Sequence, residues 1–241
     1  MQIHLFDTAT QVGHAAAMLV AAQLIQKPNS VLGLATGSSP IPTYRHLINW
    51  HKEGVVDFSE AVTFNLDEYV GIPKNHPASY HTFMDAELFS HINVPKGNIH
   101  IPNGSASNLQ RECSDYDTAI SMAGGIDIQL LGIGRNGHIG FNEPHEQFVY
   151  GCHVVQLTQS TMEANRRFFD TGEEVPSQAI SLGIGSIMNA RQVVLIATGA
   201  DKAQAIRRAI REDVHPQVQA SILRTHRNVI ILLDKAAAGL L

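Results

Sequence analysis

The residues best suited to chemistry lie in the stretch LLGIGRNGHIGFNEP (130–144). His138 can act as an acid or a base near neutral pH, and the carboxylate of Glu143 can fix its tautomer and orientation. The same loop presents Asn136 and Asn142. Glycines permit tight backbone turns that bring such side chains around one point. The stretch therefore predicts acid–base catalysis by His138, with Glu143 as its partner.

The same stretch contains Gly132-x-Gly134-x-x-Gly137, which is the spacing of a dinucleotide-binding turn. A true dinucleotide fingerprint continues into a helix and has an acidic residue about 20 positions further on. Here Pro144 follows soon after the last glycine, and Cys152 occupies the position where the acid would stand. A metal site is also disfavoured, because the histidine spacing is not His-Glu-x-x-His and no third ligand is clustered nearby.

A second segment, NLDEY (65–69), ends an apolar run with two adjacent acids. Strands disfavour aspartate, so a carboxylate pair at a strand end is unusual. Successive strand side chains point to opposite sides, and we therefore expect only one of Asp67 and Glu68 to face a substrate. Asp67 is the candidate general base. The alternative for this segment is an acidic surface turn.

A third segment, ATGSSP (35–40), precedes a helical pattern and is suited to anion binding. Gly37 permits close approach of the backbone, and the hydroxyls of Thr36, Ser38 and Ser39 can donate hydrogen bonds to an anion. The start of a helix adds free N–H groups and a favourable dipole. The alternative is an ordinary strand-to-helix turn in which a serine caps the helix.

Cations that could complete such an anion site occur later in the chain. Lys202 lies at a predicted helix start, where its charge opposes the helix dipole, and a bound anion would offset that cost. Arg166 and Arg167 could supply a guanidinium fork for the same anion. The alternative for each of these three residues is a solvated surface cation.

Each of these segments follows or adjoins an apolar, β-branched run, and helical patterns separate the runs. Several runs are apolar throughout, which is typical of a parallel sheet covered on both faces. Among the helices, one begins near Thr8 or Thr10 as N-cap, and another spans 202–212. The predicted strands are 31–35, 62–66, 126–133, 153–157, 179–184, 193–198 and 229–233.

This alternation predicts an α/β fold, a Rossmann-like, doubly wound and mostly parallel open sheet flanked by helices. Ligands bind such sheets at the carboxyl ends of the strands, where the polar, glycine-rich segments lie. We expect a single domain over 1–241, with 70–110 elaborating the sheet and 144–178 including a lid.

Charge, apolar content and cysteine count indicate which partners and which compartment to expect. The formal net charge is −5 and no Lys/Arg cluster is dense, so a nucleic-acid partner is not expected. No apolar run approaches the ~20 residues of a membrane helix, and the first residues do not form a signal peptide. The two cysteines give no disulfide framework. We therefore expect a soluble protein in the reducing cytoplasm.

As a set, LGLATGSSP, FNLDEYVG, LLGIGRNGHIGFNEP and the positions of Arg167 and Lys202 resemble the glucosamine-6-phosphate deaminase/isomerase family. The match runs in order from about residue 30 to 235. The resemblance implies conversion of glucosamine 6-phosphate and water to fructose 6-phosphate and ammonia, in amino-sugar catabolism and without a cofactor. It assigns ring opening to His138 with Asn136 and Glu143, and C2-to-C1 proton transfer to Asp67. The phosphate-binding positions that it implies are Gly37, Ser38, Ser39, Arg167 and Lys202.

Two departures from the family pattern bear on these expectations. Some members carry aspartate where this chain has Asn136. A neutral amide can orient His138 by a hydrogen bond but cannot stabilise an imidazolium by its charge, so we assign more of the ring-opening role to Glu143. The sequence ends at Leu241, soon after the last predicted strand, whereas longer members have a C-terminal extension and form allosteric hexamers. We therefore expect the short form, as a monomer rather than a hexamer.

Two other functions fit parts of the sequence. A 6-phosphogluconolactonase-like hydrolase would share the fold and a phosphosugar substrate. A sugar-phosphate-sensing module would bind the ligand without turnover. The combination of Asp67 with the His138–Glu143 pair favours the deaminase over both.

Overall fold

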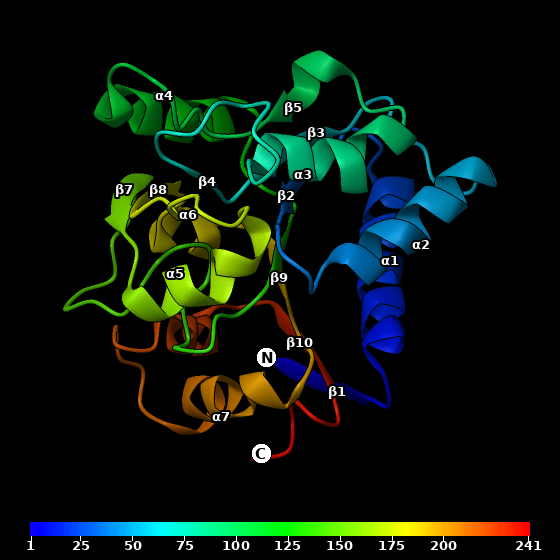
Figure 1. Ribbon diagram of the computed structural model, residues 1–241. Coiled ribbons are helices and arrows are strands. Elements are labelled where there is room, and N and C mark those ends of the chain that lie inside the picture. Colours follow the sequence, from blue (N-terminus) through cyan, green and yellow to red (C-terminus); the bar gives the residue numbers. More distant parts are fainter.

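The apolar runs form the centre of the fold. The computed structural model describes residues 1–241, and its main sheet has seven parallel strands in the order β1-β10-β9-β6-β2-β3-β5 (Figure 1). This architecture confirms the predicted α/β class. The strands are β1 (Gln2–Phe6), β2 (Val31–Leu34), β3 (Val62–Asn65), β5 (Ile99–His100), β6 (Ile128–Leu131), β9 (Gln192–Ala197) and β10 (Val229–Asp234).

Helices cover both faces of this sheet, because side chains on each central strand alternate between two apolar clusters. In β9, Val194 packs in the cluster formed with α1, α2 and α3, whereas Val193 and Leu195 pack in the cluster formed with α4, α6 and α7. None of the helices combines the length and apolar character needed to cross a membrane. The helices are α1 (Ala9–Gln26), α2 (Ile41–Lys52), α3 (Tyr80–Glu87), α4 (Leu109–Met122), α5 (Gln159–Asn165), α6 (Ile184–Met188) and α7 (Ala203–Arg211), with 3-10 turns at η1 (Phe89–His91), η2 (Lys96–Asn98), η3 (Arg166–Phe168), η4 (Ala200–Lys202) and η5 (Gln219–Thr225).

Two helix starts were predicted in detail. The hydroxyl of Thr8 accepts a hydrogen bond from the Gln11 N–H, while the Gln11 side chain accepts one from the Thr8 N–H. This reciprocal capping box confirms Thr8, rather than Thr10, as the N-cap of α1. The helix predicted over 202–212 begins one residue later, so Lys202 lies in η4, just before α7.

Two of the predicted strands do not join the main sheet. β7 (His153–Gln156) and β8 (Gln178–Ser181) pair antiparallel, and β8 also pairs antiparallel with β4 (Asp67–Tyr69). The expectation that apolar runs belong to one parallel sheet was therefore wrong here. β7 is only half-buried, as expected for the edge of a small sheet.

The sheet reverses its strand order between β2 and β6. From β2 the chain builds outward through β3 to β5, and from β6 it builds the other way through β9 to β10. In open α/β sheets a crevice forms at such a reversal, beyond the carboxyl ends of the strands. The polar segments that follow β2, β3, β6 and β9 therefore meet at one place.

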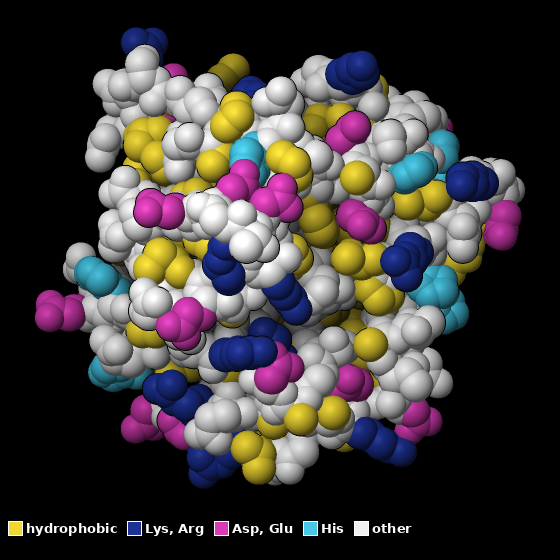
Figure 2. Space-filling view, in the orientation of Figure 1, with side chains coloured by type: hydrophobic (Ala, Val, Ile, Leu, Met, Phe, Trp, Pro, Cys, Tyr) yellow, Lys and Arg dark blue, Asp and Glu magenta, His cyan; other side chains and the backbone are white.

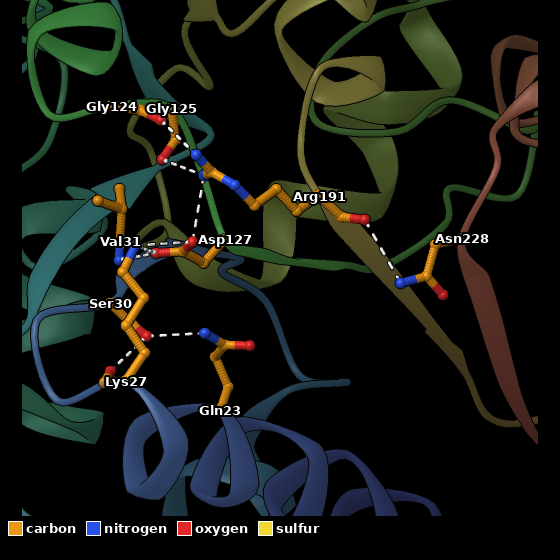
Figure 3. Close-up of polar contacts among 9 residues, drawn as sticks. All are labelled: Gln23, Lys27, Ser30, Val31, Gly124, Gly125, Asp127, Arg191 and Asn228. Carbon is orange, nitrogen blue, oxygen red and sulfur yellow. Dashed lines mark hydrogen bonds and ion pairs between the residues drawn. The ribbon is translucent and has the colours of Figure 1, made fainter.

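At the opposite end of the sheet, one buried carboxylate connects the starts of three strands (Figure 3). Asp127 precedes β6 and accepts hydrogen bonds from the Val31 N–H at 2.8 Å, from Lys27 Nζ at 2.7 Å and from Arg191 Nη1 at 3.1 Å. Lys27 ends α1 and Arg191 precedes β9. One side chain thus ties together the starts of three neighbouring strands, far from the crevice.

Candidate active site

A cavity of about 280 Å³ occupies the crevice beyond β2, β3, β6 and β9. The hollow lies on the face shown in Figure 2, where Lys and Arg side chains gather. All four segments singled out in the sequence contribute to it. Of the nine predicted site residues, eight line the cavity: Gly37, Ser38, Ser39, Asp67, Asn136, His138, Arg167 and Lys202. Glu143 lies directly behind them.

Asp67 projects into the cavity from β4 and is only 5% exposed. Its one hydrogen bond comes from the Thr36 hydroxyl at a long 3.5 Å. Burial, reinforced by the nearby charge of Glu68, raises the pKa of Asp67 to about 8. A carboxylate with so few donors and a raised pKa is suited to accept a proton from carbon.

Glu68 points away from the cavity, as the alternation of strand side chains predicted. Its carboxylate accepts hydrogen bonds from the Ser79 hydroxyl at 2.6 Å and from the Tyr69 N–H at 2.8 Å. It also accepts weaker bonds from the N–H groups of Tyr80 and His81, in the first turn of α3. Burial raises the pKa of Glu68, and these hydrogen bonds oppose that shift. Glu68 therefore fixes α3 against β4 rather than facing a substrate.

His138 and Glu143 form the predicted pair. The Nδ1 atom of His138 lies 3.5 Å from Oε2 of Glu143, and the His138 side chain lines the cavity. Burial alone would raise the pKa of Glu143. The His138 ring, together with Thr161 and Asn136, instead lowers it to about 2, so Glu143 is a carboxylate at any physiological pH.

Asn136 acts differently from the prediction. Its amide does not bond the imidazole of His138. Instead, Nδ2 donates to Oε2 of Glu143 at 2.6 Å, and Oδ1 accepts from the backbone N–H of His138 at 3.1 Å. Asn136 therefore holds Glu143 and the loop backbone in place, because an amide can donate and accept at once.

Two glycines of the loop that carries His138 are required by the shape of its backbone. A Cβ on Gly134 would lie 2.3 Å from the His138 ring, and Gly137 has a φ of +91°. Neither position tolerates a side chain without moving the histidine or straining the backbone. This confirms that Gly-x-Gly-x-x-Gly here positions His138.

The other end of the cavity carries positive charge. Arg167 Nη2 lies 3.5 Å from the Ser38 hydroxyl, although the two residues are 129 positions apart. Lys202 joins them on the cavity wall. Burial, together with the nearby Arg135 and Arg167, lowers the pKa of Lys202. The three polar side chains surround a space in which an anion would accept hydrogen bonds.

The structure bears on three further expectations for this end of the cavity. Neither serine caps α2, because its N-cap is Pro40 and no side-chain hydrogen bond is made there. Arg166 does not join Arg167 in a fork, since it donates instead to the backbone oxygen of Asp170. The hydroxyl of Thr36, predicted as an anion donor, points to Asp67.

Several cavity residues were missed. Tyr80 comes from the start of α3, and no local pattern marks it, because Glu68 brings that helix to the site. Thr161 and Asn165 come from α5, inside the segment expected to include a lid. Arg135 and Asp201 were detectable as charges within or beside glycine-rich loops.

No group of three or more His, Cys, Asp or Glu side chains is placed to hold a metal ion. A second and more open hollow, about 560 Å³, lies between α4 and β7. It is lined by Cys113 and Cys152 and contains none of the predicted site residues.

The fold and the cavity together define an α/β protein with an anion-binding end and a proton-transfer end in one crevice. Residues 6–231 match the family model for glucosamine-6-phosphate isomerases and 6-phosphogluconolactonase. The chain belongs to this family.

The family model covers two activities, and similar individual proteins carry more specific names. The glucosamine-6-phosphate deaminase of Thermoanaerobacter sp. (strain X514) is 53% identical over 94% of this chain and 89% of its own length. That of Alkaliphilus oremlandii is 48% identical over the full length of both chains. Among solved structures, a monomeric glucosamine-6-phosphate deaminase superposes with a TM-score of 0.97 at 40% identity, over all of both chains. The 6-phosphogluconolactonase of Trypanosoma brucei has a TM-score of 0.80 at 21% identity, which shows the shared fold.

Proposed function

We propose that the protein is a glucosamine-6-phosphate deaminase, which converts glucosamine 6-phosphate and water to fructose 6-phosphate and ammonia. The observation that carries the proposal is the placement of Asp67 and the His138–Glu143 pair in one cavity whose far end is cationic. The deaminases named above, with identities of 40% to 53%, support the same activity.

The phosphate anchors the substrate at the cationic end. In the proposed site it accepts hydrogen bonds from Ser38, Arg167 and Lys202 and from the backbone of the loop containing Gly37 and Ser39. Gly37 has a φ of +86° and open space beside its Cα, so the backbone can approach an anion closely. Anchoring one end lets the remaining side chains act on C1, C2 and the ring oxygen.

His138 opens the ring. The C1 hydroxyl loses a proton, the C1–O5 bond breaks, and O5 gains a proton, so that His138 relays one proton with no net change. Glu143 stabilises the imidazolium that forms in between, because its carboxylate stays ionised beside Nδ1. Asn136 keeps Glu143 in position through the hydrogen bond to Oε2.

Asp67 then moves the carbon-bound proton. Its carboxylate takes the proton from C2 of the open aldehyde, and O1 gains the proton that the C2 ammonium group gives up. The product is an enolamine with a C1–C2 double bond. Return of the proton to C1 leaves an imine at C2. Water adds to that imine and ammonia leaves, which gives the C2 ketone of fructose 6-phosphate. The scarcity of donors around Asp67 keeps its carboxylate basic enough for the first step.

A lactonase reaction uses this site less well. Hydrolysis of a lactone ester needs an activated water but no base for a carbon-bound proton, so it does not call for a carboxylate placed to act on carbon. The experiment that separates the two functions offers wild-type protein glucosamine 6-phosphate and 6-phosphogluconolactone in turn. We expect ammonia from the first and no hydrolysis of the second above the spontaneous rate. The reverse result would assign the protein to the lactonases.

We further propose that the protein works as a monomer in the cytoplasm. The solved deaminase that superposes over the whole chain is monomeric. Cys113 and Cys152 are both free thiols, which suits a reducing compartment.

A further inference from the structure

The cationic end of the cavity holds one more charge pair than the phosphate site requires. Arg135 and Asp201 both line the cavity beside Arg167 and Lys202. Arg135 belongs to the loop that also carries Asn136 and His138, whereas Asp201 belongs to η4. Magenta and dark blue side chains are interspersed around the hollow in Figure 2.

Asp201 is the present partner of both neighbouring cations. Its Oδ2 atom lies 3.0 Å from Nε of Arg135 and 3.8 Å from Nζ of Lys202. The Nε contact is the only hydrogen bond of the Arg135 side chain, so both terminal nitrogens of its guanidinium are free. A guanidinium presents five N–H donors, and most of those on Arg135 remain available to a ligand.

The pair between Arg135 and Asp201 is easily exchanged. The Arg135 side chain is 60% exposed and the Asp201 side chain 43% exposed, and ion pairs this open to solvent contribute little stability. A phosphate monoester carries up to two negative charges and three strong acceptor oxygens, against one charge on the carboxylate. A phosphate in the cavity therefore competes favourably for Arg135.

The charges also balance. Arg135, Arg167 and Lys202 supply three positive charges, and Asp201 removes one, which leaves two. Two positive charges match a phosphate dianion. Without Arg135 the same cluster would carry only one.

We propose that Arg135 is a phosphate-binding residue, which exchanges Asp201 for the substrate phosphate when the sugar binds. The inference rests on the proposed phosphosugar substrate and adds a residue to its recognition. Asp201 then acts as a competitor that keeps the cations in place while the cavity is empty.

Calorimetric titration with inorganic phosphate tests this exchange without any turnover. We expect Arg135→Gln to weaken phosphate binding about tenfold, the loss expected for one charge-assisted hydrogen bond. Asp201→Asn removes the competitor, and we expect it to tighten binding at least about twofold. Arg207→Gln is the matched control, because Arg207 pairs with Glu212 at 3.2 Å on α7, outside the cavity. It should bind phosphate as the wild type does.

Unchanged phosphate binding in Arg135→Gln would overturn the proposal, and so would no binding by the wild type. Weaker binding in Asp201→Asn would also contradict the exchange, since Asp201 would then be positioning Arg135 rather than competing for it. Thermal unfolding of each variant checks that it is folded. A wild type that binds phosphate but releases no ammonia would refute the deaminase while leaving the result for Arg135 standing.

Discussion

At the scale of single residues, the site separates two carboxylates by their surroundings. Asp67 is buried with one long hydrogen bond, whereas Glu143 is buried beside the His138 ring and accepts hydrogen bonds from Asn136 Nδ2 and the Thr158 N–H. At Asp67 the effect of burial is the larger one, and the pKa is raised. At Glu143 the His138 ring and the hydrogen-bond donors outweigh burial, and the pKa is lowered. The raised pKa suits Asp67 to its proposed role as a base for carbon, and the lowered pKa keeps Glu143 an anion.

The raised pKa of Asp67 predicts how activity depends on pH. Below about pH 8 the unliganded protein holds a proton on Asp67 and cannot accept another. We expect kcat/KM to rise with pH up to that value and then to level off. Carbon NMR of the unliganded protein should show one aspartate carboxyl that titrates near pH 8 and is missing in Asp67→Asn. An aspartate signal that titrates only in the usual acidic range would contradict this assignment.

Asn136 gives a second prediction. Replacing it by aspartate would set two carboxylates within the 2.6 Å that now separates its amide nitrogen from Glu143. Like charges so close raise one pKa strongly, which would weaken the stabilisation of protonated His138. We expect Asn136→Asp to lower kcat/KM at neutral pH by about tenfold or more. Asn136→Ala, which adds no charge, should lose less. Wild-type activity in Asn136→Asp would show that the amide donor is not needed.

At the scale of elements, stability and chemistry lie at opposite ends of the sheet. Asp127 ties the starts of β2, β6 and β9, and it is only 4% exposed. Asp127→Ala leaves the buried Val31 N–H unpaired, so we expect it to lower the free energy of unfolding by about 2 kcal/mol. Arg191→Ala should cost less than about 1 kcal/mol, because that side chain is largely exposed.

Urea unfolding measures both variants. The folded fraction of Asp127→Ala should keep the wild-type kcat and KM, because no strand end that lines the cavity is touched. Equal losses in Asp127→Ala and Arg191→Ala would mean that the buried N–H is not what the carboxylate stabilises.

The same scale shows what the sequence could predict. The apolar runs could be recognised as strands, because strands buried on both faces are apolar throughout. The polar segments after them could be recognised as a site, because open α/β sheets bind ligands at the carboxyl ends of their strands. The direction of β7 and β8 was not visible, since pairing depends on tertiary contacts. The strand β1 could not be recognised either, because its residues are mostly exposed. The strands β4 and β5 were too short to be recognised, with three and two residues.

Among site residues, the local signals were sufficient for Asp67, His138 and Glu143. Tyr80 could not be found in this way, because it reaches the cavity only when Glu68 anchors the start of α3. The bonds of Asn136 were predicted to the wrong partner, since the sequence does not show how the loop folds back on itself.

At the scale of the whole molecule, the cavity is built from one chain. Its lining residues come from segments spread over the chain, from Ala35 to Lys202. We expect light scattering after size exclusion to give a single species near 26.2 kDa, with or without phosphate. A stable larger assembly at working concentration would contradict the proposed monomer.

The most direct test of the central claim follows the substrate itself. Wild-type protein and Asp67→Asn are incubated with glucosamine 6-phosphate in deuterated water, and ammonia, fructose 6-phosphate and exchange at C2 are measured. We predict equal amounts of ammonia and fructose 6-phosphate from the wild type. Asp67→Asn should give neither product and no exchange at C2, while still binding inorganic phosphate. Ammonia release or full C2 exchange by Asp67→Asn, or no ammonia from the wild type, would contradict the account.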